Sequence, residues 1–223
     1  TPLLRAVKRI RASVVGLLYA HEALPFGRFY QGAIGMTPAG FRSAQRLAPG
    51  AKHAHLGWGM DMGFYAQMPY EPEFVLSCGK TYRDFRVIAD AFGEMDVPLK
   101  MICPYSADDV PMPDNVERIS RGEVDSSVSY AELKDKYYRR ALCVLVSLLP
   151  DPGNKRAVGF TNLLEAMAMG RPVVVTRTGA IVEELDVEKH GVGIFCEPGD
   201  AKGMRSAIEY LAQHPREAEE MGR

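Results

Sequence analysis

Between residues 74 and 213, short apolar runs alternate with amphipathic stretches, and this alternation constrains the fold more than any other feature of the sequence. Such an alternation is typical of parallel strands that are joined by crossover helices. The apolar runs predict strands at residues 74–78, 100–103, 116–120, 142–148, 172–176 and 193–196. The amphipathic stretches predict helices at residues 82–93, 130–140, 161–169, 181–185 and 201–213. We therefore expect an α/β fold, a Rossmann-like parallel sheet flanked by helices, with ligands bound outside the carboxyl ends of its strands.

The stretch GFTNLLEAMAMGRPVVVTRTGA, residues 159–180, predicts a helix that leads directly into a buried strand. Thr161 is the expected N-cap, and the apolar residues after it recur at three- and four-residue spacing. The first amides of such a helix have no intrahelical acceptors and favour a phosphate. Glu165 lies about one turn into the helix, and two interpretations of it stay open. It accepts hydrogen bonds from a polyol such as a ribose, or it only complements the helix dipole.

This stretch resembles the signature of the retaining glycosyltransferases of family four, which have the GT-B fold. That signature has two glutamates separated by seven residues. Glu165 aligns with the second glutamate, and Val158 stands in place of the first, which usually faces the donor sugar. Further landmarks of the family recur in the same order. They are AKHAHLGWGMDMGFY, FVLSCGKTYRDFRVIADAF, VSYAELKDKYYRRALCVLVSLLPD, TRTGAIVEEL and GVGIFCEPGDAKGMRSAI.

The resemblance implies a set of site residues. A basic residue after the strand glycine and another a few residues later hold the donor diphosphate in that family, and these positions fall on Lys80 and Arg83. Gly79 lets the backbone approach a ligand. The residues implied to bind the donor are Gly79, Gly159, Phe160, Thr161, Asn162 and Glu165, and Lys155 and Arg156 lie close enough in sequence to reinforce them. Tyr130 and Leu133 border the nucleotide base by resemblance, although core packing of a shared helical face also explains them.

The resemblance also divides the chain into two domains. Residues 71–223 correspond to the C-terminal nucleotide-sugar-binding domain. Residues 1–70 correspond to a remnant of the acceptor-side domain plus a linker, so the second Rossmann-like domain is incomplete. In it we expect a strand at residues 32–37, a helix at 38–47 and a strand at 52–57. The chain therefore resembles a fragment or a reduced member of the family.

The implied function is transfer of a sugar, with retention, from a nucleotide-diphosphate-sugar donor to a hydroxyl acceptor such as a glycan, a lipid or a small molecule. The family needs no bound metal and no cofactor, and none is expected here. Two alternatives stay open: a catalytically inactive nucleotide-sugar-binding or scaffold module, motivated by Val158, and another GT-B enzyme such as a sugar-nucleotide epimerase or a phosphorylase. If Glu165 binds the ribose, Glu165→Ala is expected to weaken nucleotide binding and leave the fold intact.

Charge, cysteines and histidines bear on the partners, the compartment and the metal binding of this chain. The formal net charge of −1 argues against nucleic acid as a partner. The four cysteines have no zinc spacing and predict buried thiols in a reducing, cytoplasmic compartment. His53 and His55 share one strand face without an evident third metal ligand, and His21 matches no family motif. Apolar and basic residues at helical spacing over residues 3–18 predict either a domain helix or peripheral contact with an anionic membrane surface.

Overall fold

The computed structural model describes residues 13–19, 24, 27–79, 81–103, 109–119, 128–151 and 157–223. These residues form two compact units. The first takes in the described residues within 1–59, 151–157 and 179–185, and the second takes in those within 60–150, 158–178 and 186–223.

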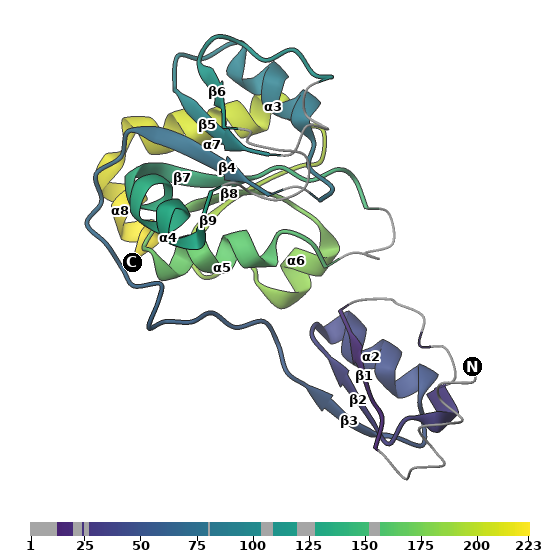
Figure 1. Ribbon diagram of the computed structural model, residues 1–223. Helices are drawn as coiled ribbons and strands as arrows, with labels where there is room; N and C mark the ends of the chain where they lie inside the picture. Colours follow the sequence, from purple (N-terminus) through teal and green to yellow (C-terminus); the bar gives the residue numbers. More distant parts are fainter. Residues whose placement is uncertain are drawn as a thin grey trace. The chain divides into compact units, whose positions relative to one another are not determined.

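The first unit has a small parallel sheet with the strand order β1-β2-β3, against which helix α2 packs (Figure 1). The strands are β1 (Val15–Leu18), β2 (Gly32–Gly35) and β3 (Lys52–His55), and α2 is Pro38–Leu47. Thr37 caps α2, because its hydroxyl accepts a hydrogen bond from Gly40 N at 3.0 Å. A short 3-10 turn, Gly27–Phe29, precedes β2, and α6 (Gly179–Glu184) groups with this unit. The three elements predicted at residues 32–57 are confirmed.

The strand β1 was not predicted. The helical spacing at residues 3–18 led us to expect a helix there, but Val15–Leu18 pair with β2 as a parallel strand. Residues 1–12, which carry most of that pattern and the proposed membrane contact, lie outside the described residues. A short run of apolar and β-branched residues is compatible with a strand or a helix, and here the strand forms because residues 15–18 pair with β2.

The second unit is built on six parallel strands in the order β6-β5-β4-β7-β8-β9. The chain enters the sheet at β4, moves outward through β5 and β6, and then returns to the other side of β4 with β7. The strand order therefore reverses between β4 and β7, as in doubly wound α/β folds. The strands are β4 (Phe74–Cys78), β5 (Leu99–Ile102), β6 (Val116–Arg118), β7 (Ala141–Val146), β8 (Val173–Thr176) and β9 (Gly193–Cys196). All six predicted strands are confirmed: β4 and β9 have the predicted bounds, and the ends of the other four differ by one or two residues.

Figure 1 shows α3 and α7 on one side of this sheet and α5 on the other. The helices are α3 (Phe85–Phe92), α4 (Tyr130–Glu132), α5 (Phe160–Ala168), α7 (Ala201–Gln213) and α8 (Pro215–Gly222). The helix predicted at residues 82–93 begins only at Phe85, because Asp84 caps it. The helix predicted at residues 130–140 is irregular, since a π-helical segment (Leu133–Tyr137) and a 3-10 turn (Tyr138–Arg140) follow α4. The helix α8 was not predicted.

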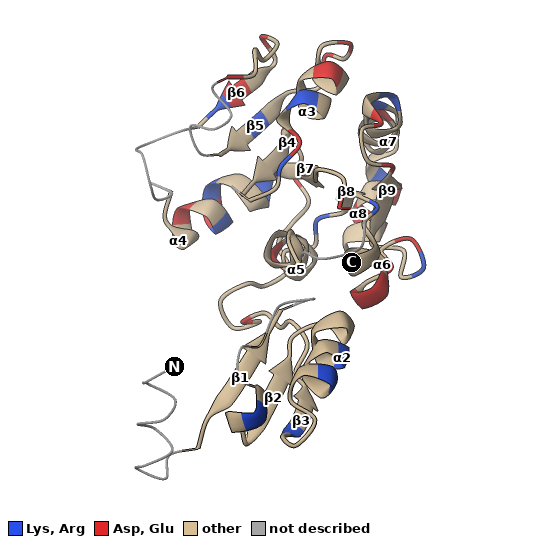
Figure 2. Ribbon diagram, turned by 90° about the vertical axis from the view of Figure 1, so that its right-hand side faces the viewer, with Lys and Arg blue, Asp and Glu red and all other residues tan. Residues whose placement is uncertain are grey.

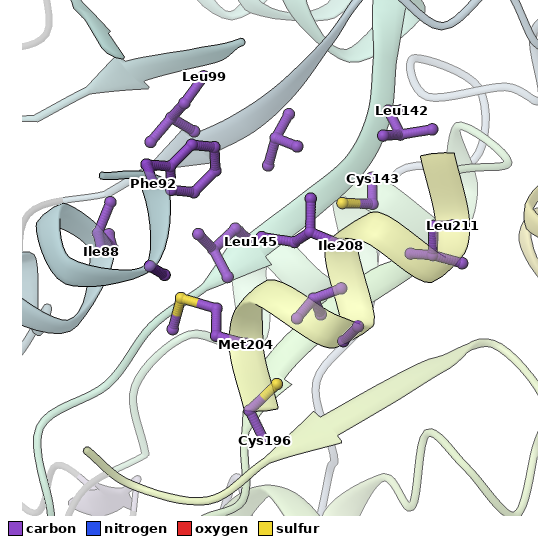
Figure 3. Close-up of a cluster of buried hydrophobic side chains, with 14 of the residues drawn as sticks. Ile88, Phe92, Leu99, Leu142, Cys143, Leu145, Cys196, Met204, Ile208 and Leu211 are labelled. Atoms are coloured by element: carbon purple, nitrogen blue, oxygen red, sulfur yellow. The ribbon is translucent and has the colours of Figure 1, made fainter. Parts of the chain in front are cut away.

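Alternate residues of the central strands pack on opposite sides of the sheet. Figure 3 shows the cluster between the sheet and helices α3 and α7, to which β7 contributes Cys143 and Leu145 and α7 contributes Ile208. The intervening strand residues, such as Leu76 and Val144, are fully buried on the side that α5 covers. The inner strands β4, β7 and β8 carry no charged residue, whereas β5 and β6 near the sheet edge do (Figure 2).

Candidate functional site

The carboxyl ends of β4 and β7 mark the point where the strand order of the second unit reverses. In open α/β sheets, ligands bind in the crevice outside the strand ends at this point. The segment after β4 contains Gly79 and Arg83, and Arg83 forms a single antiparallel bridge with Leu148, just beyond β7. The helix α5 begins on the same side of the sheet after β7, and its residue Asn162 contacts Arg83. The fold thus brings together Gly79, Arg83 and the start of α5, as the sequence predicts.

Gly79 is required by the geometry of this turn. Its φ of +113° lies in a region that L side chains rarely adopt. A Cβ atom at this position would lie 3.0 Å from Asn162 Oδ1 and would overlap the guanidinium of Arg83. The absence of a side chain therefore lets the cation and the helix terminus meet above the end of β4.

Arg83 is buried, with only 7 % of its surface exposed. Its Nη2 donates hydrogen bonds to Asn162 Oδ1 at 2.6 Å and to Cys78 O at 3.3 Å, and its Nη1 donates to Thr81 O at 2.9 Å. Burial lowers the pKa of Arg83, but a guanidinium keeps its charge in proteins. All three acceptors are neutral, so no carboxylate among the hydrogen-bond partners of Arg83 compensates its charge.

One donor of Arg83 has no partner. Its Nε is buried and makes no hydrogen bond within the part of the chain that the structure describes. A buried polar donor without an acceptor costs free energy, and a buried charge costs more. An anion at the end of β4 would supply an acceptor for this donor.

The start of α5 offers further donors. Gly159 is the N-cap, with a φ of +88°, and it supplies no side-chain cap. By contrast, Asp84 and Asp200 cap α3 and α7 through their carboxylates. The expectation that Thr161 is the N-cap is therefore wrong, since Thr161 already lies within the helix and is exposed. The first turn of α5 therefore has no side-chain cap, and the amides at a helix N-terminus favour an anion.

The remaining residues at the start of α5 take different positions. Phe160 is buried, with 3 % of its surface exposed, and Asn162 is half-buried. The Nδ2 of Asn162 donates to Cys78 Sγ at 3.2 Å while its Oδ1 accepts from Arg83. Asn162 therefore links the end of β4 to α5. Val158 is half-buried immediately before the helix.

Glu165 lies on the buried side of α5, with only 2 % of its surface exposed. Its Oε1 accepts a hydrogen bond from Tyr65 OH at 2.8 Å, and its Oε2 accepts one from Tyr138 OH at 2.6 Å. Tyr138 OH also lies 3.4 Å from Cys78 Sγ. Burial raises the pKa of both tyrosines, so both phenols remain protonated. A continuous chain of polar contacts therefore runs from Arg83 through Asn162, Cys78 and Tyr138 to Glu165.

The other predicted site residues are less closely joined to this network. Tyr130 is 68 % exposed, which rules out core packing for its ring, and Leu133 is half-buried. Tyr137 of the same segment is buried. Four residues of interest, Lys80, Lys155, Arg156 and His21, lie outside the described residues.

Sequence reasoning missed Tyr65, Tyr138 and Arg171. The side chain of Arg171 is fully buried, and its guanidinium donates to the backbone oxygens of Tyr138 at 2.9 Å, Met68 at 3.2 Å and Pro69 at 2.5 Å. A lone arginine between a helix and the strand VVVT was the available signal, because such a charge in an apolar context needs partners. The tyrosines gave no signal, since hydroxyl contacts depend on tertiary packing.

The histidines and acidic residues do not form a metal centre among the described residues, where no group of three or more His, Cys, Asp or Glu is arranged to hold an ion. His53 Nε2 instead donates to Ala48 O at 2.9 Å. All four cysteines are buried. No helix in the described ranges has the length and apolarity to span a bilayer.

Residues 107–214 match a family model described as glycosyl transferases group 1. The chain is similar to the D-rhamnosyltransferase WbpZ of Pseudomonas aeruginosa, with 26 % identity over 156 residues. That match covers 68 % of this chain but only 39 % of the relative, so the chain spans well under half of that protein's length.

Two solved structures share the fold. Alr3699/HepE of Anabaena, in complex with UDP, has a TM-score of 0.70 and 15 % identity, and the match covers 98 % of this chain and 68 % of that one. Sucrose-phosphate synthase from Thermosynechococcus elongatus has a TM-score of 0.62 and 17 % identity, with 87 % and 52 % covered. The parallel sheet flanked by helices matches the fold of GT-B glycosyltransferases. The match of residues 107–214 to the group 1 model agrees with this fold.

Proposed function

We propose that this chain is the nucleotide-sugar-binding part of a retaining GT-B glycosyltransferase, which transfers a sugar from a nucleotide-diphosphate donor to a hydroxyl acceptor. The observation that carries the proposal is the buried Arg83, whose Nε lacks a partner within the described residues at the switch point of the sheet. A diphosphate supplies the acceptors and the negative charge that this guanidinium lacks. UDP is the first candidate, because Alr3699/HepE was solved with UDP and with UDP-glucose.

In this proposal, each group performs one task. Arg83 and Lys80 stabilise the departing diphosphate, and the uncapped amides of α5 at Phe160, Thr161 and Asn162 bind its oxygens. Glu165 binds the ribose hydroxyls. The leaving phosphate itself takes the proton of the acceptor hydroxyl on the same face of the sugar, so no protein nucleophile is assigned. The domain boundary near residue 70, the cytoplasmic location and the absence of a cofactor belong to the same proposal.

A second candidate is a module that binds a nucleotide sugar without transferring it. Val158, where the family has a glutamate toward the donor sugar, favours this candidate because valine accepts no hydrogen bond. It predicts nucleotide binding without sugar transfer. An epimerase would alter the donor without an acceptor, and a phosphorylase would require inorganic phosphate.

The test is calorimetric titration of the chain with UDP, GDP and ADP, without metal, for the wild type and for Arg83→Gln and Lys80→Ala. Saturable binding of one nucleotide, weakened at least about tenfold by Arg83→Gln, is expected for loss of one charge-assisted hydrogen bond. The matched control is Arg86→Gln, which removes the same charge from an exposed position three residues along. Binding that is equally strong in wild type and Arg83→Gln would remove Arg83 from the site, and no binding of any nucleotide would contradict the proposal for this chain.

A further inference from the structure

Both oxygens of the Glu165 carboxylate are held by tyrosine hydroxyls that come from different parts of the second unit. Tyr65 lies in the segment before β4, and Tyr138 lies in the 3-10 turn that leads into β7. Their hydroxyls donate to Oε1 and Oε2 at 2.8 and 2.6 Å. A carboxylate with one donor on each oxygen cannot rotate about its last bond without breaking a hydrogen bond. Its plane is therefore fixed by Tyr65 and Tyr138.

The two tyrosines are themselves held at the backbone. The amide of Tyr65 donates to Asp61 O at 2.8 Å in a tight turn. Arg171 donates to Tyr138 O and to the carbonyls of Met68 and Pro69, and so joins the two segments that carry the tyrosines. Neither hydroxyl can follow Glu165 freely if the carboxylate turns. This arrangement supports the geometry of a binding group through a second layer of contacts.

The carboxylate retains capacity for a ligand. Two ionised oxygens have about four lone-pair positions, and the tyrosines use one on each oxygen. A ribose presents two adjacent hydroxyls, which are donors of the spacing that a fixed carboxylate accepts on its two oxygens. A freely rotating carboxylate would pay an orientational cost to bind the same diol, and preorganisation removes that cost.

We propose that Tyr65 and Tyr138 are positioning residues that orient Glu165 toward the vicinal hydroxyls of the donor ribose. This inference rests on the proposed function, in which Glu165 binds the ribose. It assigns to the segment before β4 a direct part in the nucleotide site. Its specific consequence is that loss of either hydroxyl weakens recognition of the ribose 2′-hydroxyl more than binding of the diphosphate.

The experiment compares each ribonucleoside diphosphate with its 2′-deoxy counterpart (UDP with dUDP, GDP with dGDP, ADP with dADP) by calorimetry. The nucleotide that binds the wild type is then titrated into Tyr65→Phe and Tyr138→Phe. We expect the wild type to prefer the ribonucleotide, and each variant to reduce that preference about threefold to tenfold, as for the net contribution of one typical hydrogen bond. The affinity for the deoxynucleotide, which keeps the 3′-hydroxyl, should fall less than the affinity for the ribonucleotide.

Tyr70→Phe is the matched control. Tyr70 OH donates to Leu142 O at 2.8 Å, so this variant also deletes one phenolic hydrogen bond in the same unit but leaves Glu165 untouched. It should keep the wild-type preference for the ribonucleotide. Thermal unfolding of each variant identifies any loss of fold, and Tyr65→Phe tests the inference by itself if Tyr138→Phe does not fold.

The possible outcomes distinguish a failure of the positioning role from a failure of the proposed function. If a ribonucleotide binds and both tyrosine variants keep the wild-type preference over the deoxynucleotide, the positioning role is wrong. The proposed function then still stands. A wild type that does not distinguish the two sugars overturns the inference in the same way. A wild type that binds none of the three nucleotides overturns the proposed function, and the inference with it.

Discussion

At Gly79 the backbone adopts a φ of +113° directly beside the guanidinium of Arg83. An alanine here meets two obstacles, the unfavourable backbone conformation and the overlap of its Cβ with Arg83. We expect Gly79→Ala to displace Arg83 and to lower the free energy of unfolding by about 1–3 kcal/mol. Nucleotide affinity should fall with it, as measured by calorimetry.

Gly191→Ala is the control that introduces backbone strain without a steric overlap. Gly191 also has a positive φ, +66°, but no atom other than those of its chain neighbours lies within 4 Å of the Cβ position. The Gly191 variant should lose stability through strain alone, by about 1 kcal/mol, and should bind nucleotide as the wild type does. Unchanged nucleotide binding in Gly79→Ala would contradict the close approach of Arg83.

Glu165 has a structural role beside its proposed role in binding. We expect Glu165→Ala to leave the fold intact but to lower its stability, because this carboxylate is 2 % exposed and accepts hydrogen bonds from two tyrosines. The substitution leaves a cavity and deprives the buried Tyr138 hydroxyl of its carboxylate acceptor. We expect urea denaturation to show a loss of about 2–3 kcal/mol, as for a broken buried polar network. Glu117→Ala, at an exposed position, is the control and should change stability by less than about 1 kcal/mol.

At the level of the elements, hydrophobic periodicity located the strands because a buried parallel strand needs an uninterrupted apolar run. It located β4, β7 and β8 within two residues. It failed where tertiary contacts decide, as at Val15–Leu18, where strand pairing overrides a helical pattern. The helical segment after Tyr130 is irregular, and Tyr138 within it is held by Glu165 through its hydroxyl and by Arg171 through its carbonyl.

The same distinction holds for the candidate site. A glycine after a strand and a basic residue soon after it form a local pattern, so the sequence alone could place Gly79 and Arg83 near the end of β4. Tyr65 is 100 residues from Glu165 along the chain, and no local pattern connects them. Such a contact follows only from the three-dimensional fold.

Arg171 connects elements that are distant in sequence. It donates to Tyr138 O, Met68 O and Pro69 O and lies over the ring of Tyr70, with 5.3 Å between Cζ and the ring centroid. Arg171→Ala leaves three carbonyls without this donor. We expect the free energy of unfolding to fall by about 3 kcal/mol or more in urea denaturation.

Arg177→Ala is the control for this change. Arg177 also pairs with oxygen acceptors, Glu188 and Glu197, but its side chain is 37 % exposed. Exposed ion pairs contribute less than about 1 kcal/mol. Equal losses of stability in the two variants would contradict a special role for the buried Arg171.

At the scale of the whole molecule, buried thiols predict a loss of stability at alkaline pH. Burial raises the pKa of Cys78 to about 11 and that of Cys196 to about 12, and it also raises the pKa of Cys143. Unfolded thiols ionise near pH 9, whereas the folded Cys78 stays protonated until about pH 11. Ionisation therefore favours the unfolded state as the pH rises from about 9 to 11, and the full stability is present below pH 9.

Two units of pKa correspond to about 3 kcal/mol for Cys78 over this range. Urea midpoints in the wild type should change little between pH 7.5 and 9 and should fall between pH 9 and 10.5, and the fall should be smaller in Cys78→Ala. Val144→Ala also removes buried volume from a central strand but removes no titrating group. This variant should be less stable at every pH and should keep the wild-type slope. A Cys78→Ala slope equal to that of the wild type would show that this thiol does not control the transition.

The second unit should fold without the first, provided that the segment before β4 is retained. The cluster of buried residues between the sheet and helices α3 and α7 lies entirely within residues 75–218. Residues 60–73 contribute Tyr65, the carbonyls of Met68 and Pro69, and Tyr70, whose hydroxyl donates to Leu142 O.

We expect a fragment of residues 60–223 to unfold cooperatively and to bind the same nucleotide as the whole chain. A fragment of residues 74–223 should be less stable by about 3 kcal/mol or more, because it leaves Arg171 and Glu165 without these partners. Equal urea midpoints for the two fragments would mean that the segment before β4 contributes nothing to the unit, and would also argue against Tyr65 as a partner of Glu165.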